Sequence, residues 1–168
     1  MAAGATYTPI ATTTLGSDQT SVTFSSISGS YTDLVCIVNG AVTSADNTYM
    51  DFNGDTAANY SQTALRGNGS SALSNRYSSN NYIVNDVTSF PDTTLSDYTL
   101  IVNINNYSNS TTYKTSLSRS NQAGTGVATS VGLWRSTAAI TQIDIIPVSG
   151  GSIINTGTVA TLYGILAA

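Results

Sequence analysis

The chain has 168 residues and a mass of 17.4 kDa, which is the usual size of one domain. Only 8% of the residues are charged, against about 25% in an ordinary soluble domain, and the formal net charge is −4. This balance argues against a nucleic-acid partner held by clustered Lys and Arg, and the absence of histidine removes the commonest general base and metal ligand.

Short segments rich in Val, Ile, Thr and Tyr recur along the whole chain, separated by clusters of Gly, Asn, Asp and Ser. These residues favour strands, and no helical period is sustained. We therefore expect an all-β fold over residues 1–168, a single antiparallel β-sandwich that is jelly-roll-like, with a short N-terminal arm of about residues 1–7. The expected strands are Tyr7 to Leu15, Ser21 to Phe24, Thr32 to Asn39, Thr48 to Phe52, Tyr60 to Arg66, Tyr82 to Val87, Tyr98 to Asn105, Tyr113 to Arg119, Val127 to Trp134, Thr141 to Val148 and Thr158 to Ile165.

The segment Tyr98 to Asn105 alternates most cleanly, with Leu100, Val102 and Ile104 on one face. Successive side chains of a strand point to opposite faces, so this strand has a core side and a wet side.

The segment from 34 to 38 is apolar on both faces. Leu34, Cys36 and Val38 point one way, and Val35 and Ile37 point the other. We expect both faces to be covered, with a partner subunit as one possible cover for Val35 and Ile37. Cys36 is the only cysteine, and in this run it is interpreted as a small buried apolar side chain.

The turns are marked by residues that tolerate positive φ, such as Asn53-Gly54 and Asn68-Gly69. The stretch Gly67 to Asn81, dense in Ser and Asn, is predicted to be a long surface loop. Lys114 is the only lysine, so the sheets have few of the charges that normally discourage edge-to-edge association. Their edges are therefore expected to be short, covered or paired, and assembly with other subunits is favoured over solvation by Ser, Thr and Asn alone.

Catalytic chemistry has little support in the sequence. A Ser-Lys pair would need Lys114, which looks like an exposed strand residue. A carbohydrate-active enzyme could use paired carboxylates among Asp46, Asp51, Asp55 and Asp86. This is the weakest of the functional hypotheses. We expect no enzyme activity and no cofactor.

The segment Asp51 to Asp55 places oxygen ligands at alternate positions, as the first half of a calcium loop does. The twelfth position holds Gln62 instead of Glu, and the glycine falls at the fourth place instead of the sixth. A strand-to-turn junction around Asn53-Gly54 is therefore the preferred interpretation, and no metal is expected.

Trp134 is the only tryptophan, and Arg135 follows it. In the preceding strand Val127, Val131 and Leu133 alternate away from Trp134, which places the indole on the opposite face. An anchor in the core or in a subunit interface is favoured over a sugar-stacking platform, because Trp and Arg are enriched in interfaces and a lone aromatic residue is a weak binding signal.

Several stretches together resemble a family of virion structural proteins from phages of aquatic bacteria and cyanobacteria. The similarity runs from end to end, and the block around Trp134 is its most specific part. The stretches are Tyr7 to Thr12, Tyr31 to Val35, Asp51 to Asp55 with Asn59 to Ser61, Asn106 to Asn109 with Tyr113 to Thr115, Gly132 to Ile140, and Leu162 to Ile165.

The resemblance implies a β-sandwich, often trimeric, that serves as a capsid cement protein or as the head of a tail fibre. The first hypothesis is a cement (decoration) protein that docks as a homotrimer on the major capsid protein, made in the host cytoplasm and located on the virion surface. The second is a fibre head that recognises host glycan through the Gly67 to Asn81 loop. Neither hypothesis needs a nucleic acid, and no apolar stretch is long enough for a signal peptide or a membrane span. The predicted oligomer or capsid interface consists of Tyr7 with the N-terminal arm, Val35, Ile37, Trp134 and Arg135.

Overall fold

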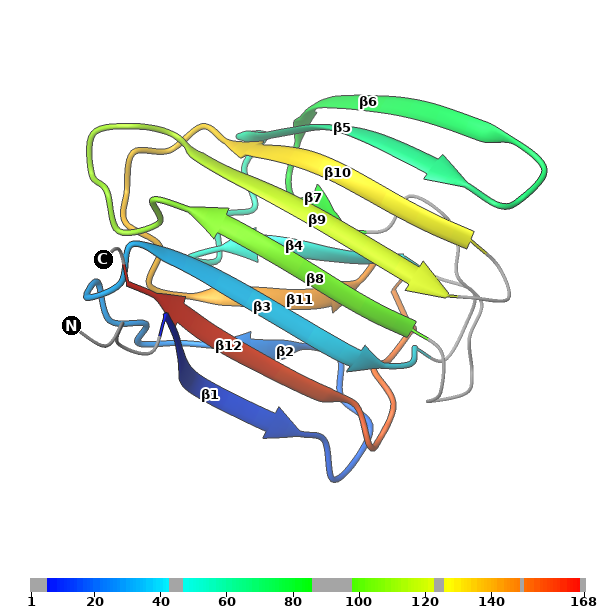
Figure 1. Ribbon diagram of the computed structural model, residues 1–168, viewed down its shortest axis with the longest axis horizontal. Helices are drawn as coiled ribbons and strands as arrows, with labels where there is room; N and C mark the ends of the chain where they lie inside the picture. Colours follow the sequence, from blue (N-terminus) through cyan, green and yellow to red (C-terminus); the bar gives the residue numbers. More distant parts are fainter. Residues whose placement is uncertain (1–5, 43–46, 86–97, 123–125, 149, 167–168) are drawn as a thin grey trace.

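The computed structural model describes residues 6–42, 47–85, 98–122, 126–148 and 150–166, and nothing but strands, turns and irregular segments occurs in these ranges. The strands form two antiparallel sheets that face each other, so the predicted all-β, jelly-roll-like sandwich is confirmed (Figure 1). The strands are β1 (Tyr7–Thr14), β2 (Val22–Phe24), β3 (Asp33–Gly40), β4 (Thr48–Phe52), β5 (Tyr60–Gly67), β6 (Ala72–Asn80), β7 (Ile83–Val84), β8 (Tyr98–Asn105), β9 (Lys114–Gln122), β10 (Gly126–Trp134), β11 (Ile143–Pro147) and β12 (Val159–Ile165).

The larger sheet has eight strands in the order β1-β12-β3-β8-β9-β10-β5-β6, and the smaller has four in the order β2-β11-β4-β7. In Figure 1 the four-stranded sheet lies behind the eight-stranded sheet. Several neighbouring strands come from distant parts of the chain, as in the pairing of β3 with β12, so the sheets depend on long-range contacts.

One apolar cluster between the sheets forms the core. Leu100, Val102 and Ile104 of β8 are at most 1% exposed, which confirms the core side predicted for this strand. They share the cluster with Met50 and Phe52 of the smaller sheet. Burial of such alternating faces is the main force that holds a sandwich together.

The side chains of β9 and β10 that point into the sandwich are mostly small, and several of them are polar. Ser118 and Ser130 are buried and their hydroxyl groups are 2.6 Å apart. At Gly132 a Cβ atom would lie 2.7 Å from Cδ1 of Ile83, so the glycine allows β7 to approach β10 closely. The small inward side chains thus leave room for residues 83–85, where Asn85 is fully buried.

The prediction of a long surface loop from Gly67 to Asn81 is wrong. Residues 72–80 form β6, which pairs with β5 as a hairpin. The turn uses Gly69 at a φ of 85° and the side chain of Asn68, whose Oδ1 accepts hydrogen bonds from the backbone N–H groups of Ser70 and Ser71. A strand at the end of a sheet needs no continuous apolar face, which is why a Ser- and Asn-rich segment forms one here.

The other expected strands agree with the structure within three residues at each end where both are described, apart from the strand expected at Tyr82 to Val87. That strand is reduced to β7, Ile83–Val84, and its residues 86 and 87 lie outside the described ranges. Residues 1–5 of the expected N-terminal arm are also outside them, and Tyr7 is the first residue of β1.

Candidate functional site

The face of the eight-stranded sheet that points away from the core is the candidate site, and we call it the open face. No described element covers it in Figure 1. It carries large apolar side chains that are between 47% and 57% exposed. They are Leu65, Leu117, Val127 and Val131.

Two adjacent rows of side chains cross the open face. In the first row Val35 lies opposite Asn103, which lies opposite Leu117, which lies opposite Val131. Directly opposite residues of antiparallel strands have neighbouring side chains on the same face. Leu117 and Val131 therefore form an exposed apolar pair near the middle of the sheet.

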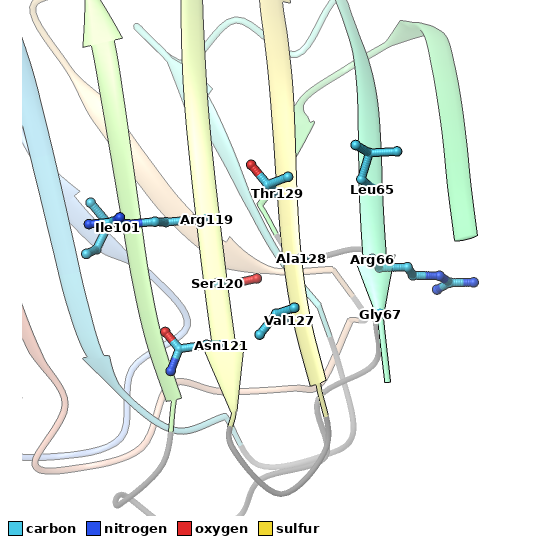
Figure 2. A pocket seen from close by; sticks show the side chains of 10 residues that line it. All are labelled: Leu65, Arg66, Gly67, Ile101, Arg119, Ser120, Asn121, Val127, Ala128 and Thr129. Atoms are coloured by element: carbon cyan, nitrogen blue, oxygen red, sulfur yellow. The ribbon is translucent and has the colours of Figure 1, made fainter. Parts of the chain in front are cut away.

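The second row places a charge among apolar groups. Ile37 lies opposite Ile101, Ile101 opposite Arg119, Arg119 opposite Thr129, and Thr129 opposite Leu65. Figure 2 shows the side chain of Arg119 extending across the sheet toward Ile101. Arg119 is exposed, so its guanidinium group is available to a partner.

An open depression of about 660 Å³ lies on the same face (Figure 2). Its polar lining includes Arg119, Asn121 and Thr129, and its apolar lining includes Leu65, Ile101 and Val127. The combination of a cation, an amide and a hydroxyl with apolar groups suits a polar ligand or a side chain of a partner protein.

Sequence reasoning missed the exposed residues of β9 and β10 because the two faces of these strands have reversed roles. The serines at 116, 118 and 120 of β9 are buried, whereas Leu117 between them is exposed. In β10, Ala128, Ser130 and Gly132 face the interior, whereas Val127 and Val131 are exposed. The alternation itself was visible in the sequence, but it would have assigned the serine face to solvent.

The structure places two of the predicted interface residues on the open face. Val35 is 3% exposed, and its direct neighbours on the face are Tyr163 and Asn103. The side chain of Val35 is therefore covered by neighbours in its own sheet, and its burial needs no partner subunit. Ile37 is half-buried beside Ile101 and remains partly available.

Trp134 is 2% exposed and lies in the core, on the opposite face from Val127 and Val131, as its strand pattern predicted. The indole is within 5.6 Å of the Phe52 ring and 6.2 Å of the Tyr60 ring, measured between centroids. These contacts fit the core-anchor interpretation and leave little of the ring for a partner.

Arg135 is half-buried and caps a neighbouring loop. Its Nη2 donates hydrogen bonds to the carbonyl oxygens of Ala58, at 2.8 Å, and Tyr60, at 3.4 Å. At the far edge of the sheet, Tyr7 is 55% exposed and its ring contacts Tyr163 edge-on at 6.2 Å. The structure thus does not bring Tyr7, Trp134 and Arg135 into one site.

Lys114 is buried rather than exposed, contrary to the expectation. Its relative exposure is 1%, and Nζ donates to the carbonyl oxygens of Thr112, at 2.8 Å, and Thr137, at 3.2 Å. Burial lowers the pKa of Lys114 because it disfavours the charged ammonium group. The two hydrogen bonds link the segment before β9 to the segment after β10 at one end of the sandwich.

The segment Asp51 to Asp55 is a strand-to-turn junction, as expected, because β4 ends at Phe52 and the turn follows at once. Asn53 and Gly54 have φ values of 57° and 65°, and the Asn53 side chain accepts from the N–H groups of Thr141 and Gln142. Oδ2 of Asp55 accepts hydrogen bonds from Nδ2 of Asn59, at 2.9 Å, and from Nε1 of Trp134, at 2.7 Å. Across the described ranges, no group of three or more Cys, Asp or Glu side chains is placed to hold a metal ion.

Two acids meet on the outer face of the smaller sheet. Asp51 of β4 lies directly opposite Asp144 of β11, and both are less than 10% exposed. Burial, reinforced by the neighbouring Asp144 carboxylate, raises the pKa of Asp51 to about 6. Asp144 accepts hydrogen bonds from Thr23, at 2.6 Å, and Gln142, at 2.7 Å.

No protein-family model matches this chain, and no curated protein matches it. Among solved structures, a galectin of Caenorhabditis elegans, LEC-6, is 14% identical over 86% of this chain and 92% of its own, with a TM-score of 0.35. A human SPRY domain is 9% identical over 91% and 96%, with a TM-score of 0.23. The C2A and C2B domains of extended synaptotagmin 2 are 9% identical over 82% and 42%, with a TM-score of 0.18. Within the described ranges, no helix has the length and apolar character needed to cross a membrane.

Proposed function

We propose that this chain is a non-enzymatic cement protein of a bacteriophage capsid, which binds the outer shell through the open face and stabilises it. The partner is the major capsid protein, as the family resemblance implies. The same resemblance implies a homotrimer, an alternative to the dimer proposed below, and sizing chromatography distinguishes the two. A partner that binds only the intact shell raises the apparent stability of the shell by mass action.

The observation that carries the proposal is the reversed pattern of β9 and β10. Serines occupy the interior while Leu117, Val127 and Val131 are left on the surface. Exposing leucine and valine in place of available serines gains nothing for an isolated domain, because burial of apolar groups is what stabilises folding. These apolar side chains would contribute to stability when a second protein covers the open face and buries them.

Arg119 would supply specificity at the centre of this surface. It is flanked by Ile101 on one side and Thr129 on the other, with Leu117 two residues before it. Arginine surrounded by apolar groups is a typical arrangement of residues that dominate binding energy in interfaces. A carboxylate of the shell protein would pair with the guanidinium group as water is excluded.

The test is an add-back experiment on particles stripped of this protein. Rebinding of the purified chain should restore resistance to heat and osmotic shock. Leu117→Asp and Val131→Asp should each weaken binding about tenfold or more, since one central contact is worth roughly 1 to 2 kcal/mol. Stripped particles that resist heat as well as complete ones would overturn the proposal.

Tyr113→Ser is a matched control, because Tyr113 is 54% exposed but precedes β9 and lies outside the rows of the open face. It should bind particles like the unchanged chain. Far-ultraviolet circular dichroism should show that all three variants keep the sheet structure. Equal losses in Tyr113→Ser and Leu117→Asp would mean that the open face is not the docking surface.

A second candidate function, the head of a tail fibre that recognises host glycan, is supported by the depression beside Arg119. Asn121 and Thr129 add an amide and a hydroxyl group to its lining, which are groups that bind sugar hydroxyls. A glycan array and a host-cell adsorption assay with the purified chain separate the two functions. Specific binding that Asn121→Ala abolishes would favour the fibre head.

A further inference from the structure

The eight-stranded sheet ends in two edge strands that differ in their protection. β1 carries Pro9, which lacks a backbone N–H, and its pairing with β12 is interrupted between Pro9 and Ala11. Proline and bulges discourage pairing with a further strand. In the smaller sheet the edge strands β2 and β7 have only three and two residues. These edges are poor templates for association.

The other edge, β6, is less protected, because its single irregularity lies at its end, where Ser79 has a φ of 57° and is skipped in the pairing with β5. It has nine residues without Pro or Lys, and it pairs regularly with β5 from Ala72 to Ser78. Among the described strands, none pairs with its outer edge. Figure 1 shows β6 as the last strand of the sheet, beyond β5. A long, regular edge of this kind presents a row of backbone N–H and C=O groups to a further strand.

We propose that β6 pairs antiparallel with β6 of a second copy of this chain, which joins two eight-stranded sheets into one across a two-fold axis. A two-fold contact uses the same edge of both copies and leaves no β6 edge free, so the assembly closes at a dimer. The open faces of the two copies then lie on the same side. This interface is distinct from the open face and does not depend on the proposed function.

The side chains of β6 select one register. A two-fold axis normal to the sheet keeps both smaller sheets on one side, so residues of the same face must pair with each other. Leu73, Asn75 and Tyr77 share the face of their β5 partners Arg66, Ala64 and Gln62. With Asn75 opposite Asn75, Leu73 lies opposite Tyr77 on both sides of the axis.

This register also separates the charges. Arg76 lies opposite Ser74, whereas a shift of one residue per strand would place Arg76 opposite Arg76. Like charges directly opposite each other destabilise a sheet, and an aromatic ring opposite an aliphatic side chain stabilises it. Leu73 is 49% exposed in the single chain, so the pairing would bury it against Tyr77.

The position of the axis is tested with Asn75→Cys under mild oxidation. Directly opposite residues have Cα atoms about 4.5 to 5.5 Å apart, which is within the range of a disulfide. The resident Cys36 is fully buried and does not compete. We expect a disulfide-linked dimer from Asn75→Cys and none from Thr12→Cys, the matched variant on the exposed face of β1. Efficient linkage through Arg76→Cys instead would overturn the register.

The association itself is measured by sedimentation equilibrium of the full chain without particles. A dimer is expected, and Asn75→Lys should convert it to a monomer by placing two ammonium groups at the axis, whereas Thr12→Lys should leave it dimeric. Circular dichroism of each variant checks that the strands are retained. A monomer at all concentrations, a trimer, or a dimer that survives Asn75→Lys would overturn the proposal, while failure of particle binding would affect only the proposed function.

Discussion

Trp134 donates a hydrogen bond from Nε1 to Oδ2 of Asp55 at 2.7 Å, which ties the end of β10 to the turn that follows β4. Trp134 belongs to the eight-stranded sheet, and Asp55 follows a strand of the four-stranded sheet, so the hydrogen bond links the two layers at one end of the sandwich. Burial alone raises the pKa of Asp55, but hydrogen bonds from Asn59, Trp134 and Ala57 outweigh it and lower the pKa below its usual value. The ionised carboxylate is thus part of the folded structure.

Replacement of Trp134 by Phe should destabilise the chain by about 2 to 4 kcal/mol, because it removes the bond to Asp55 and leaves a cavity beside Phe52. Urea unfolding followed by circular dichroism measures the loss. Asp55→Asn, which keeps the packing, should cost less. A Trp134→Phe variant as stable as the unchanged chain would show that the indole is not an anchor.

The Asp51–Asp144 pair predicts a pH dependence of stability. The folded pKa of Asp51 is about 6 and its usual value is 3.8, so the folded state retains a proton that the unfolded state loses. Stability should therefore fall as the pH rises from 3.8 to about 6 and stay low above it.

Asp51→Asn should remove this fall and raise stability near neutral pH by about 1 to 2 kcal/mol, after allowance for screening by water. Melting temperatures across the pH range measure it. Asp18→Asn is the control, since hydrogen bonds from Thr156 lower the pKa of Asp18, and stability from that group is lost only toward acid. An unchanged slope in Asp51→Asn would contradict the assignment.

Lys114 offers a test of what a buried amine contributes. Lys114→Met keeps most of the side-chain volume but removes the charge and the two hydrogen bonds that Nζ donates to Thr112 and Thr137, so it should cost about 1 to 2 kcal/mol. Lys114→Ala loses the same hydrogen bonds and the packing as well, which should cost about 2 to 4 kcal/mol. Chemical denaturation of the two variants compares them, and equal losses would mean that packing plays no part.

Gly132→Ala should cost about 1 to 3 kcal/mol, because the new Cβ would lie 2.7 Å from Ile83 Cδ1 and 2.7 Å from Ser116 Oγ. Gly16→Ala is the control, since nothing lies within 4 Å of a Cβ at that glycine. Thermal unfolding of both variants is the measurement. If Gly132→Ala melts like Gly16→Ala, the close approach of β7 to β10 is not needed for stability.

The strand pattern of the sequence was sufficient for the fold class. In β8, the alternation of Leu100, Val102 and Ile104 predicted both the strand and its buried face, because side-chain direction follows from the backbone alone. The opposite faces of Trp134 and Val131 in β10 were predicted for the same reason. Local turn chemistry likewise identified Asn53-Gly54 as a turn.

Only the tertiary structure decided which face of each strand is covered and which strands are neighbours. The burial of Lys114 and of the serines of β9, the exposure of Leu117, and the pairing of Asp51 with Asp144 all depend on partners far away in the chain. The polar strand β6 forms by pairing with β5 across the turn at Asn68 and Gly69, which the local propensity of Ser and Asn does not express. Side-chain alternation is a property of one strand, whereas burial is a property of the assembled sheets.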